Sequence, residues 1–262
     1  VAALASGRDD KRNLDLIVAG TGSTNLIFLN AATGKHLDDV ISPYGLPDRI
    51  RVHLHPVTGE SQFMVGHSQL TCCSSVRVWN PQAKQEICYE KSLIPKGRTD
   101  YGWDSCSLVE LQIQALGPDQ SERVIVLRQG AVNQLTVYDQ ATADPLWDAT
   151  LGGAPVALVV RSRYEAGDAR CFVAEQFGGI VGFDAQGERV FSTRLASSLQ
   201  GMSATPNGSL VAWSSNQLYL IKDGRHFDSF SITGKSLGFI GSAINHGFLS
   251  SDSAQLHFQK IN

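Results

Sequence analysis

An internal repeat of short apolar runs and polar turns constrains the fold of this chain most strongly. Each copy contains an apolar run, a small turn, a second apolar run and a further turn that begins with Asn or Asp. These lead residues are Asn30, Asn80, Asp139, Asp184 and Asp223, at spacings of 50, 59, 45 and 39 positions. Such a period is typical of a unit with four strands and three tight loops. Because Asn, Asp and Gly turns separate runs of period two, the sequence predicts an all-β fold without long helices.

A further apolar run precedes the other two in each copy, and we expect these runs to line a central channel. They cover residues 1–5, 50–54, 108–113 and 156–160, and polar linkers are predicted at 7–12, 117–120 and 164–168. A sixth copy, from Gly238 to Gln259, has only three apolar runs. Five copies of four strands and one of three predict 23 strands, and the missing strand is the outermost of the last copy. We expect residues before Val1 to supply it, or the edge to stay open.

Two kinds of known repeat are similar to these turns. Residues 30–35 (NAATGK) and 139–147 (DQATADPLW) resemble the strand–turn–strand signature of quinoprotein-like propeller repeats, and residues 76–80 (VRVWN) resemble a WD-repeat strand. Only Trp147 stands where a quinoprotein docking Trp would, and no Trp-Asp dipeptide closes a WD-type strand. The resemblance implies a β-propeller of about six four-stranded blades, the last lacking its outer strand within this chain. The expected blades are 1–44, 45–104, 105–154, 155–199, 200–234 and 235–262, in a single domain.

Composition limits the classes of partner. Hydrophobic residues make up 42% of the chain, enough for a sizeable core, and 22 Lys and Arg stand against 25 Asp and Glu. With a net charge of −3, we expect no nucleic-acid partner, and without an 18-residue apolar run we expect no membrane insertion. Five Cys, an odd number, favour a reducing compartment such as the cytoplasm. Because the chain lacks an initiator Met, we expect a processed chain or a fragment.

The motifs that could carry chemistry are sparse. Cys72 and Cys73 are adjacent, and the quinoprotein resemblance implies a vicinal disulfide under a cofactor, whereas two small loop residues are the simpler interpretation. The sequence offers no cluster of carboxylate and amide oxygens for the calcium ion that such a cofactor needs. His53 and His55 alternate along one predicted strand, where they would line the channel or face solvent. We therefore predict no catalytic residues, no metal site and no cofactor.

Two long loops are the strongest functional signal. They cover residues 66–75 and 94–105, and a propeller topology places both on one face. The second contains Tyr, Trp, Arg and Lys, and Tyr, Trp and Arg are the residues most enriched at interface hot spots. We predict a contact patch for a protein or peptide partner formed by His67, Lys96, Arg98, Tyr101 and Trp103. In the alternative interpretation, Tyr101 and Trp103 pack under the loop.

These features predict a non-enzymatic propeller scaffold within a larger protein or assembly. A second function stays open, which is a quinoprotein-like oxidoreductase or a hydrolase with its site at the mouth of the channel. The missing acid and base set favours the scaffold.

Overall fold

The computed structural model consists of strands and the turns that join them. It describes residues 2–41, 45–55, 58–68, 75–89, 107–116, 121–130, 132–161, 169–205, 208–222, 225–231, 235–241, 246–251 and 256–260. These residues form 23 strands and no helix, as the repeat predicts. Within them there is no helix long and apolar enough to cross a membrane.

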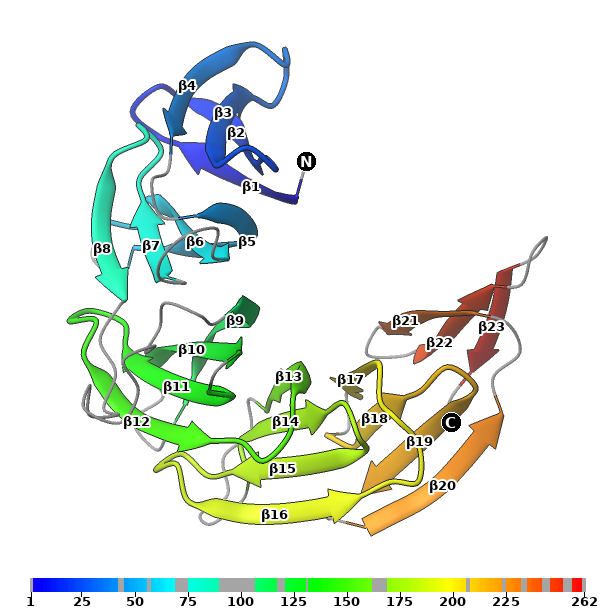
Figure 1. The fold of residues 1–262 in the computed structure, drawn as a ribbon. Coiled ribbons are helices and arrows are strands. Elements are labelled where there is room, and N and C mark those ends of the chain that lie inside the picture. Colours follow the sequence, from blue (N-terminus) through cyan, green and yellow to red (C-terminus); the bar gives the residue numbers. More distant parts are fainter. Residues whose placement is uncertain are drawn as a thin grey trace. The chain divides into compact units, whose positions relative to one another are not determined.

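The strands form six antiparallel sheets, each made of consecutive strands (Figure 1). The first three sheets contain β1 (Ala3–Asp9), β2 (Leu14–Gly20), β3 (Asn25–Asn30) and β4 (His36–Ile41); β5 (Leu46–Leu54), β6 (Ser61–Ser68), β7 (Ser75–Trp79) and β8 (Gln85–Tyr89); and β9 (Ser107–Ala115), β10 (Glu122–Gln129), β11 (Gln134–Asp139) and β12 (Pro145–Thr150). The others contain β13 (Pro155–Val160), β14 (Cys171–Glu175), β15 (Gly179–Phe183) and β16 (Arg189–Arg194); β17 (Gly201–Ala204), β18 (Leu210–Trp213), β19 (Gln217–Lys222) and β20 (Arg225–Ser231); and β21 (Lys235–Gly241), β22 (His246–Ser251) and β23 (Leu256–Lys260).

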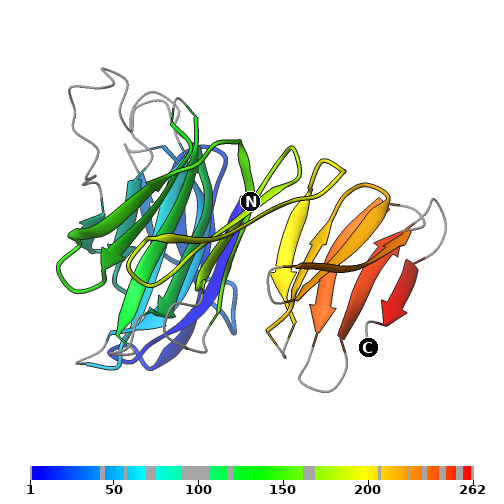
Figure 2. The ribbon, with the colours of Figure 1, turned by 90° about the horizontal axis from the view of Figure 1, so that it is seen from below.

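The last sheet has three strands where the others have four, as predicted. Its order is β21-β22-β23, and no fourth strand pairs with β23 among the described residues. Figure 2 shows β23, in red, at the free edge of this sheet. The backbone N–H and C=O groups on that edge lack a ladder partner there.

The sheets belong to two compact units, which we describe separately. Unit 1 comprises Val1–Gln114 and Glu122–Thr150 and holds the first three sheets. Unit 2 comprises Ala115–Ser121 and Leu151–Asn262 and holds the last three. The single-domain arrangement stays a prediction.

Unit 1 is held together by two apolar clusters between successive sheets. In the first, the rings of Phe28 and Phe63 meet edge to face with centroids 5.8 Å apart. In the second, Tyr89 and Tyr138 pack similarly at 5.5 Å, and the Tyr89 hydroxyl donates to the Gln140 carbonyl oxygen over 2.6 Å. Burial raises the pKa of Tyr138 to about 12, so its hydroxyl stays neutral and can hydrogen-bond within the core.

Unit 2 has an equivalent cluster between its first two sheets. Phe172 and Phe191 pack edge to face at 5.6 Å beside Met202 and Tyr219. The free thiol of Cys171 is fully buried, and burial raises its pKa to about 12. A neutral buried thiol acts as a small hydrophobic group and is chemically inert.

Four of the five lead residues of the repeat stabilise their turns through their side chains, and Asp223 lies outside the described residues. Asn30 Oδ1 accepts from the backbone N–H of Ala32 and Thr33, and Asp184 Oδ1 accepts from Gln186 and Glu188. Positive φ angles occur three or four residues later instead, at Gly34, Ala83, Ala143 and Gly187. The lead Asn and Asp therefore act as local acceptors rather than as left-handed residues.

The predicted linker at 7–12 is partly wrong, because β1 continues to Asp9. The Asp9 side chain is fully buried and accepts from Arg12 Nε at 2.5 Å and Gln82 Nε2 at 2.9 Å. Arg12 also donates to the Pro81 carbonyl oxygen over 2.7 Å, so this polar network joins the first sheet to a turn of the second. Burial alone would raise the pKa of Asp9, but the hydrogen bonds from Arg12 and Gln82 lower it.

Candidate functional site

The structure places one of the five predicted contact residues. His67 lies in β6, and its side chain is 0% exposed, so it offers no surface to a partner. Lys96, Arg98, Tyr101 and Trp103 lie outside the described residues, as do Cys72 and Cys73. The contact patch therefore stays a prediction, and the described strands around it give its setting.

The strands that flank residues 69–74 and 90–106 terminate at one end of unit 1. In the register of the second sheet, His67 pairs with Ser75 and Val76 pairs with Tyr89, so the end of β6, the start of β7 and the end of β8 coincide. The start of β9 lies at the same end, because a Cβ added to Gly66 would come 2.0 Å from Leu108 Cδ2. The chain thus enters and leaves both segments on one side of this unit.

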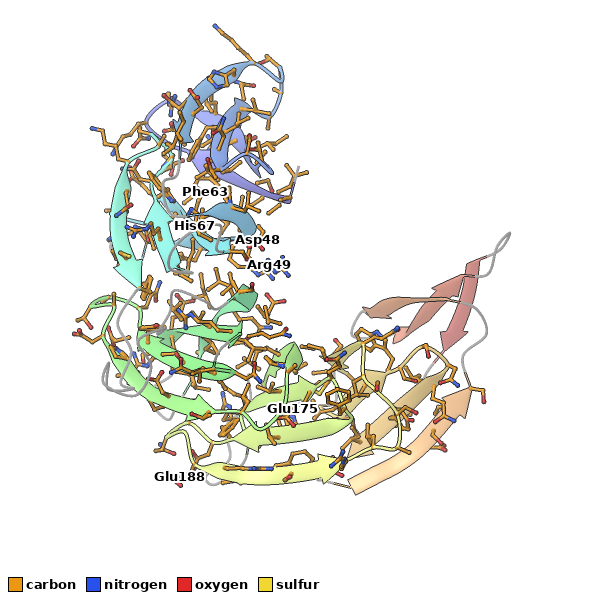
Figure 3. All side chains as sticks on the ribbon, viewed as in Figure 1. Asp48, Arg49, Phe63, His67, Glu175 and Glu188 are labelled. Carbon is orange, nitrogen blue, oxygen red and sulfur yellow. The ribbon has the colours of Figure 1, made fainter. Side chains whose placement is uncertain are left out.

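Close packing between the second and third sheets makes this end rigid. The backbone at Gly66 and the end of the Leu108 side chain are close enough that a Cβ at position 66 would require Leu108 to shift. Arg49 Nε donates to the Val109 carbonyl oxygen over 3.2 Å and thereby joins β5 to β9. Figure 3 labels Arg49 on β5 and His67 on the neighbouring β6. Both sheets hold their strand ends at fixed positions for the segments between them.

A polar pair lies beside these strand ends. Ser68 Oγ, at the last position of β6, donates to Asp48 Oδ2 over 2.5 Å. Asp48 Oδ1 is buried and accepts no hydrogen bond among the described residues. A buried carboxylate oxygen is a strong acceptor. This end of the unit can therefore accept one further donor.

The two histidines of the predicted channel take structural positions. His53 Nδ1 lies 3.0 Å from Gln140 Nε2, in the turn between β11 and β12, and the Thr58 N–H donates to His55 Nδ1 at 3.1 Å. Burial lowers the pKa of His53, so its neutral form is favoured. Among the residues that the structure describes, no three His, Cys, Asp or Glu side chains gather as metal ligands would.

A cavity of about 590 Å³ lies on the first sheet of unit 2. Its walls include Gly152, Gly153, Glu175, Phe177, Arg189 and Arg194. The sequence does not predict this site, because its residues occupy ordinary turn and strand positions of the repeat. The available signal was two arginines on one outer strand, near the glycine pairs 152–153 and 178–179.

Comparison with known proteins shows the fold and no family. No protein-family model matches the sequence, and no curated protein matches it. Three solved structures are similar at 12% sequence identity. A crystal structure of BBS1N in complex with ARL6DN gives a TM-score of 0.66 over 99% of this chain and 77% of that chain. Saccharomyces cerevisiae Sqt1 gives a TM-score of 0.68 over 94% of this chain and 68% of that chain. A Mitotic Checkpoint Complex structure gives a TM-score of 0.65 over 98% of this chain and 74% of that chain.

The likeness to these three structures supports a WD-repeat-like propeller fold, which the resemblance of residues 76–80 to a WD-repeat strand implies. The chain has an all-β propeller fold of about six blades. At 12% identity the likeness is one of fold.

Proposed function

We propose that this chain is a non-enzymatic propeller scaffold that binds a protein or peptide partner through residues 69–74 and 90–106. The contact side chains are Lys96, Arg98, Tyr101 and Trp103, whereas His67 stays in the core. The partner belongs to a larger assembly, and neither nucleic acid nor a membrane is involved.

The convergence of four strand ends on one packed platform is the observation that supports this proposal. Residues 69–74 and 90–106 both begin and end there, next to the Gly66–Leu108 contact and the Arg49–Val109 hydrogen bond. Binding residues are commonly carried by long loops on a rigid scaffold, because the scaffold holds the loop ends and an insertion adds little entropic cost. Protein assemblies among the similar structures agree with this use of the fold.

Side-chain chemistry predicts how much each residue contributes to the binding free energy. Tyr and Trp bury large areas on binding and dominate hot spots, while exposed charges contribute less because salt and water screen them. Tyr101 and Trp103 should therefore provide most of the affinity, and Lys96 and Arg98 should steer the encounter. The unpaired acceptor on Asp48 is available for a donor from the same region.

Replacing residues 94–105 by an equally long Gly/Ser linker tests the proposal. The tagged full chain and the variant are used to co-purify partners from extracts of the source cells, with quantitative mass spectrometry. Lys35→Ala, at an exposed turn of the first sheet, is the control. We expect a defined set of proteins to be lost with the linker variant and kept with the control. Equal recovery by all three proteins, each shown folded by circular dichroism, contradicts the proposal.

A further inference from the structure

The cavity on unit 2 has the properties of a second, chemically distinct binding site. It lies over β15 and β16 and is bordered by the turns at Gly152–Gly153 and at Phe177. Phe177, in the turn between β14 and β15, is 64% exposed and gives the border of the cavity an apolar surface. The site shares no residue with the segments of unit 1 discussed above.

Glycine creates the hollow. Gly179 pairs with Arg194 on β16, and on its other side β14 ends at Glu175. A Cβ at position 179 would come 2.4 Å from Glu175 Oε2, so the carboxylate occupies the space that a side chain at this position would take. Glu175 turns toward the neighbouring loop, where its Oε1 accepts from the Gly153 N–H over 2.9 Å. The floor between Glu175 and Arg194 is therefore bare backbone.

Among the described residues, the two arginines of the cavity form no ion pair. Arg194 is exposed, and within the described residues its guanidinium makes no hydrogen bond or ion pair. Arg189 Nη2 donates to the neutral Ser192 Oγ over 2.7 Å. Glu188, which precedes Arg189 in the chain, lies at the β15–β16 turn, and Glu175 lies at the opposite end of the sheet (Figure 3). The charged side chains of the cavity are therefore two arginines and one carboxylate, Glu175, so the lining carries an excess of one positive charge.

The positions of the two arginines along β16 indicate the ligand. The hydrogen bond places the Arg189 guanidinium beside Ser192, two residues before Arg194 on the same strand. Two residues of a strand span about 6.5–7 Å, which is also the repeat of side chains on one face of any extended peptide. Guanidinium groups bind carboxylates with paired hydrogen bonds. Two carboxylates on alternate residues of an extended peptide match both arginines.

We propose that this cavity binds an extended acidic peptide segment that carries carboxylates on alternate residues. The carboxylates pair with Arg189 and Arg194, and an apolar side chain of the peptide packs on Phe177. The proposal goes beyond the scaffold function, since it assigns a partner chemistry to unit 2 and needs neither residues 69–74 nor residues 90–106.

Fluorescence anisotropy of the full chain with labelled peptides tests it. The probe is an eight-residue peptide with glutamates on two alternate positions and an adjacent leucine, and its control has glutamine at both positions. We expect the acidic peptide to bind and the glutamine peptide not to bind. Arg189→Gln and Arg194→Gln should each weaken binding about tenfold, as expected for loss of one charged hydrogen-bonded contact. Lys35→Gln, which removes the same charge from an exposed turn of unit 1, should leave binding unchanged.

A charge exchange makes the test specific. The double variant Arg189→Glu/Arg194→Glu should lose the acidic peptide and gain a peptide with lysines at the same two positions. Both side chains are exposed, so circular dichroism should be unaltered. Binding that the double variant retains, or that the glutamine peptide shares, overturns the proposal. So does binding of a singly phosphorylated peptide in place of the acidic one. Replacing residues 94–105 should not change any of these results, which separates this site from the proposed scaffold surface.

Discussion

Gly20→Ala adds a single carbon atom at the contact between the first two sheets of unit 1. Gly20 is buried at the end of β2, and a Cβ added there would lie 1.9 Å from the Pro47 carbonyl oxygen at the start of β5. That oxygen belongs to the backbone, so it cannot rotate away. To reach van der Waals contact, the two strands must separate by roughly 1 Å or more.

This separation should lower the stability of unit 1 markedly. Overpacking of a filled core costs about 1–3 kcal/mol, and a clash with the backbone falls at the upper end of this range. The same strands carry the Phe28–Phe63 contact, so a shift also loosens the apolar cluster. At about 2–4 °C per kcal/mol for a chain of this size, we expect the Tm in differential scanning calorimetry to fall by about 6–12 °C.

Gly22→Ala is the matched control, two residues further along the chain. A Cβ at Gly22 meets no atom within 4 Å. The added methyl group reduces the freedom of the unfolded chain, so the substitution should be neutral or stabilise by up to about 1 kcal/mol. Equal Tm values for the two variants would refute the close approach of β2 and β5 and the packing of the first two sheets derived from it.

Three further substitutions test the polar interactions. Asp9→Ala should reduce the free energy of unfolding by about 2–3 kcal/mol in urea titrations, because it leaves Arg12 and Gln82 without their buried acceptor. The control Asp15→Ala breaks an exposed ion pair with Arg8 and should reduce the free energy of unfolding by under about 1 kcal/mol. Asp184→Ala should lower the free energy of unfolding by about 1 kcal/mol. Asp184→Asn should lower it much less, since the amide oxygen can still accept from the Gln186 and Glu188 N–H groups. Equal losses of stability in the two variants contradict the acceptor role. Because the pKa of His53 is lowered in the native state, that state holds fewer protons than the unfolded state, and the free energy of unfolding should fall as the pH drops below about 6.5. His53→Gln should flatten this pH dependence. An unchanged slope between about pH 7 and 5 in the variant contradicts the role of His53.

The sequence predicts the repeat well because each sheet is specified locally. Asn30 and Asp184 mark turns that their own side chains hold together, and the alternation of apolar runs with turns indicates the strands between them. The three-stranded last sheet follows from the same count. None of these inferences needs contacts between sheets.

Contacts between sheets explain what the sequence did not reveal. All residues of β6 except Ser68 are buried, because this sheet is covered on both faces, so His67 lies in the core although polar residues follow it along the chain. Asp9 can end a buried strand because its carboxylate accepts hydrogen bonds from Arg12 and from Gln82 of the second sheet's turn. The cavity at Arg194 likewise depends on which residue faces Gly179 in the register.

The contact surface on residues 90–106 is the central claim, and the most direct measurement compares Trp103→Ala with Lys96→Ala. The partner recovered by co-purification is titrated calorimetrically against the wild-type chain and both variants, and circular dichroism verifies folding. We expect Trp103→Ala to lose about 2 kcal/mol or more of binding free energy and Lys96→Ala to lose under about 1 kcal/mol, with both proteins folded. If Trp103→Ala unfolds the chain while its folded fraction keeps the wild-type affinity, Trp103 is a packing residue and the partner binds elsewhere.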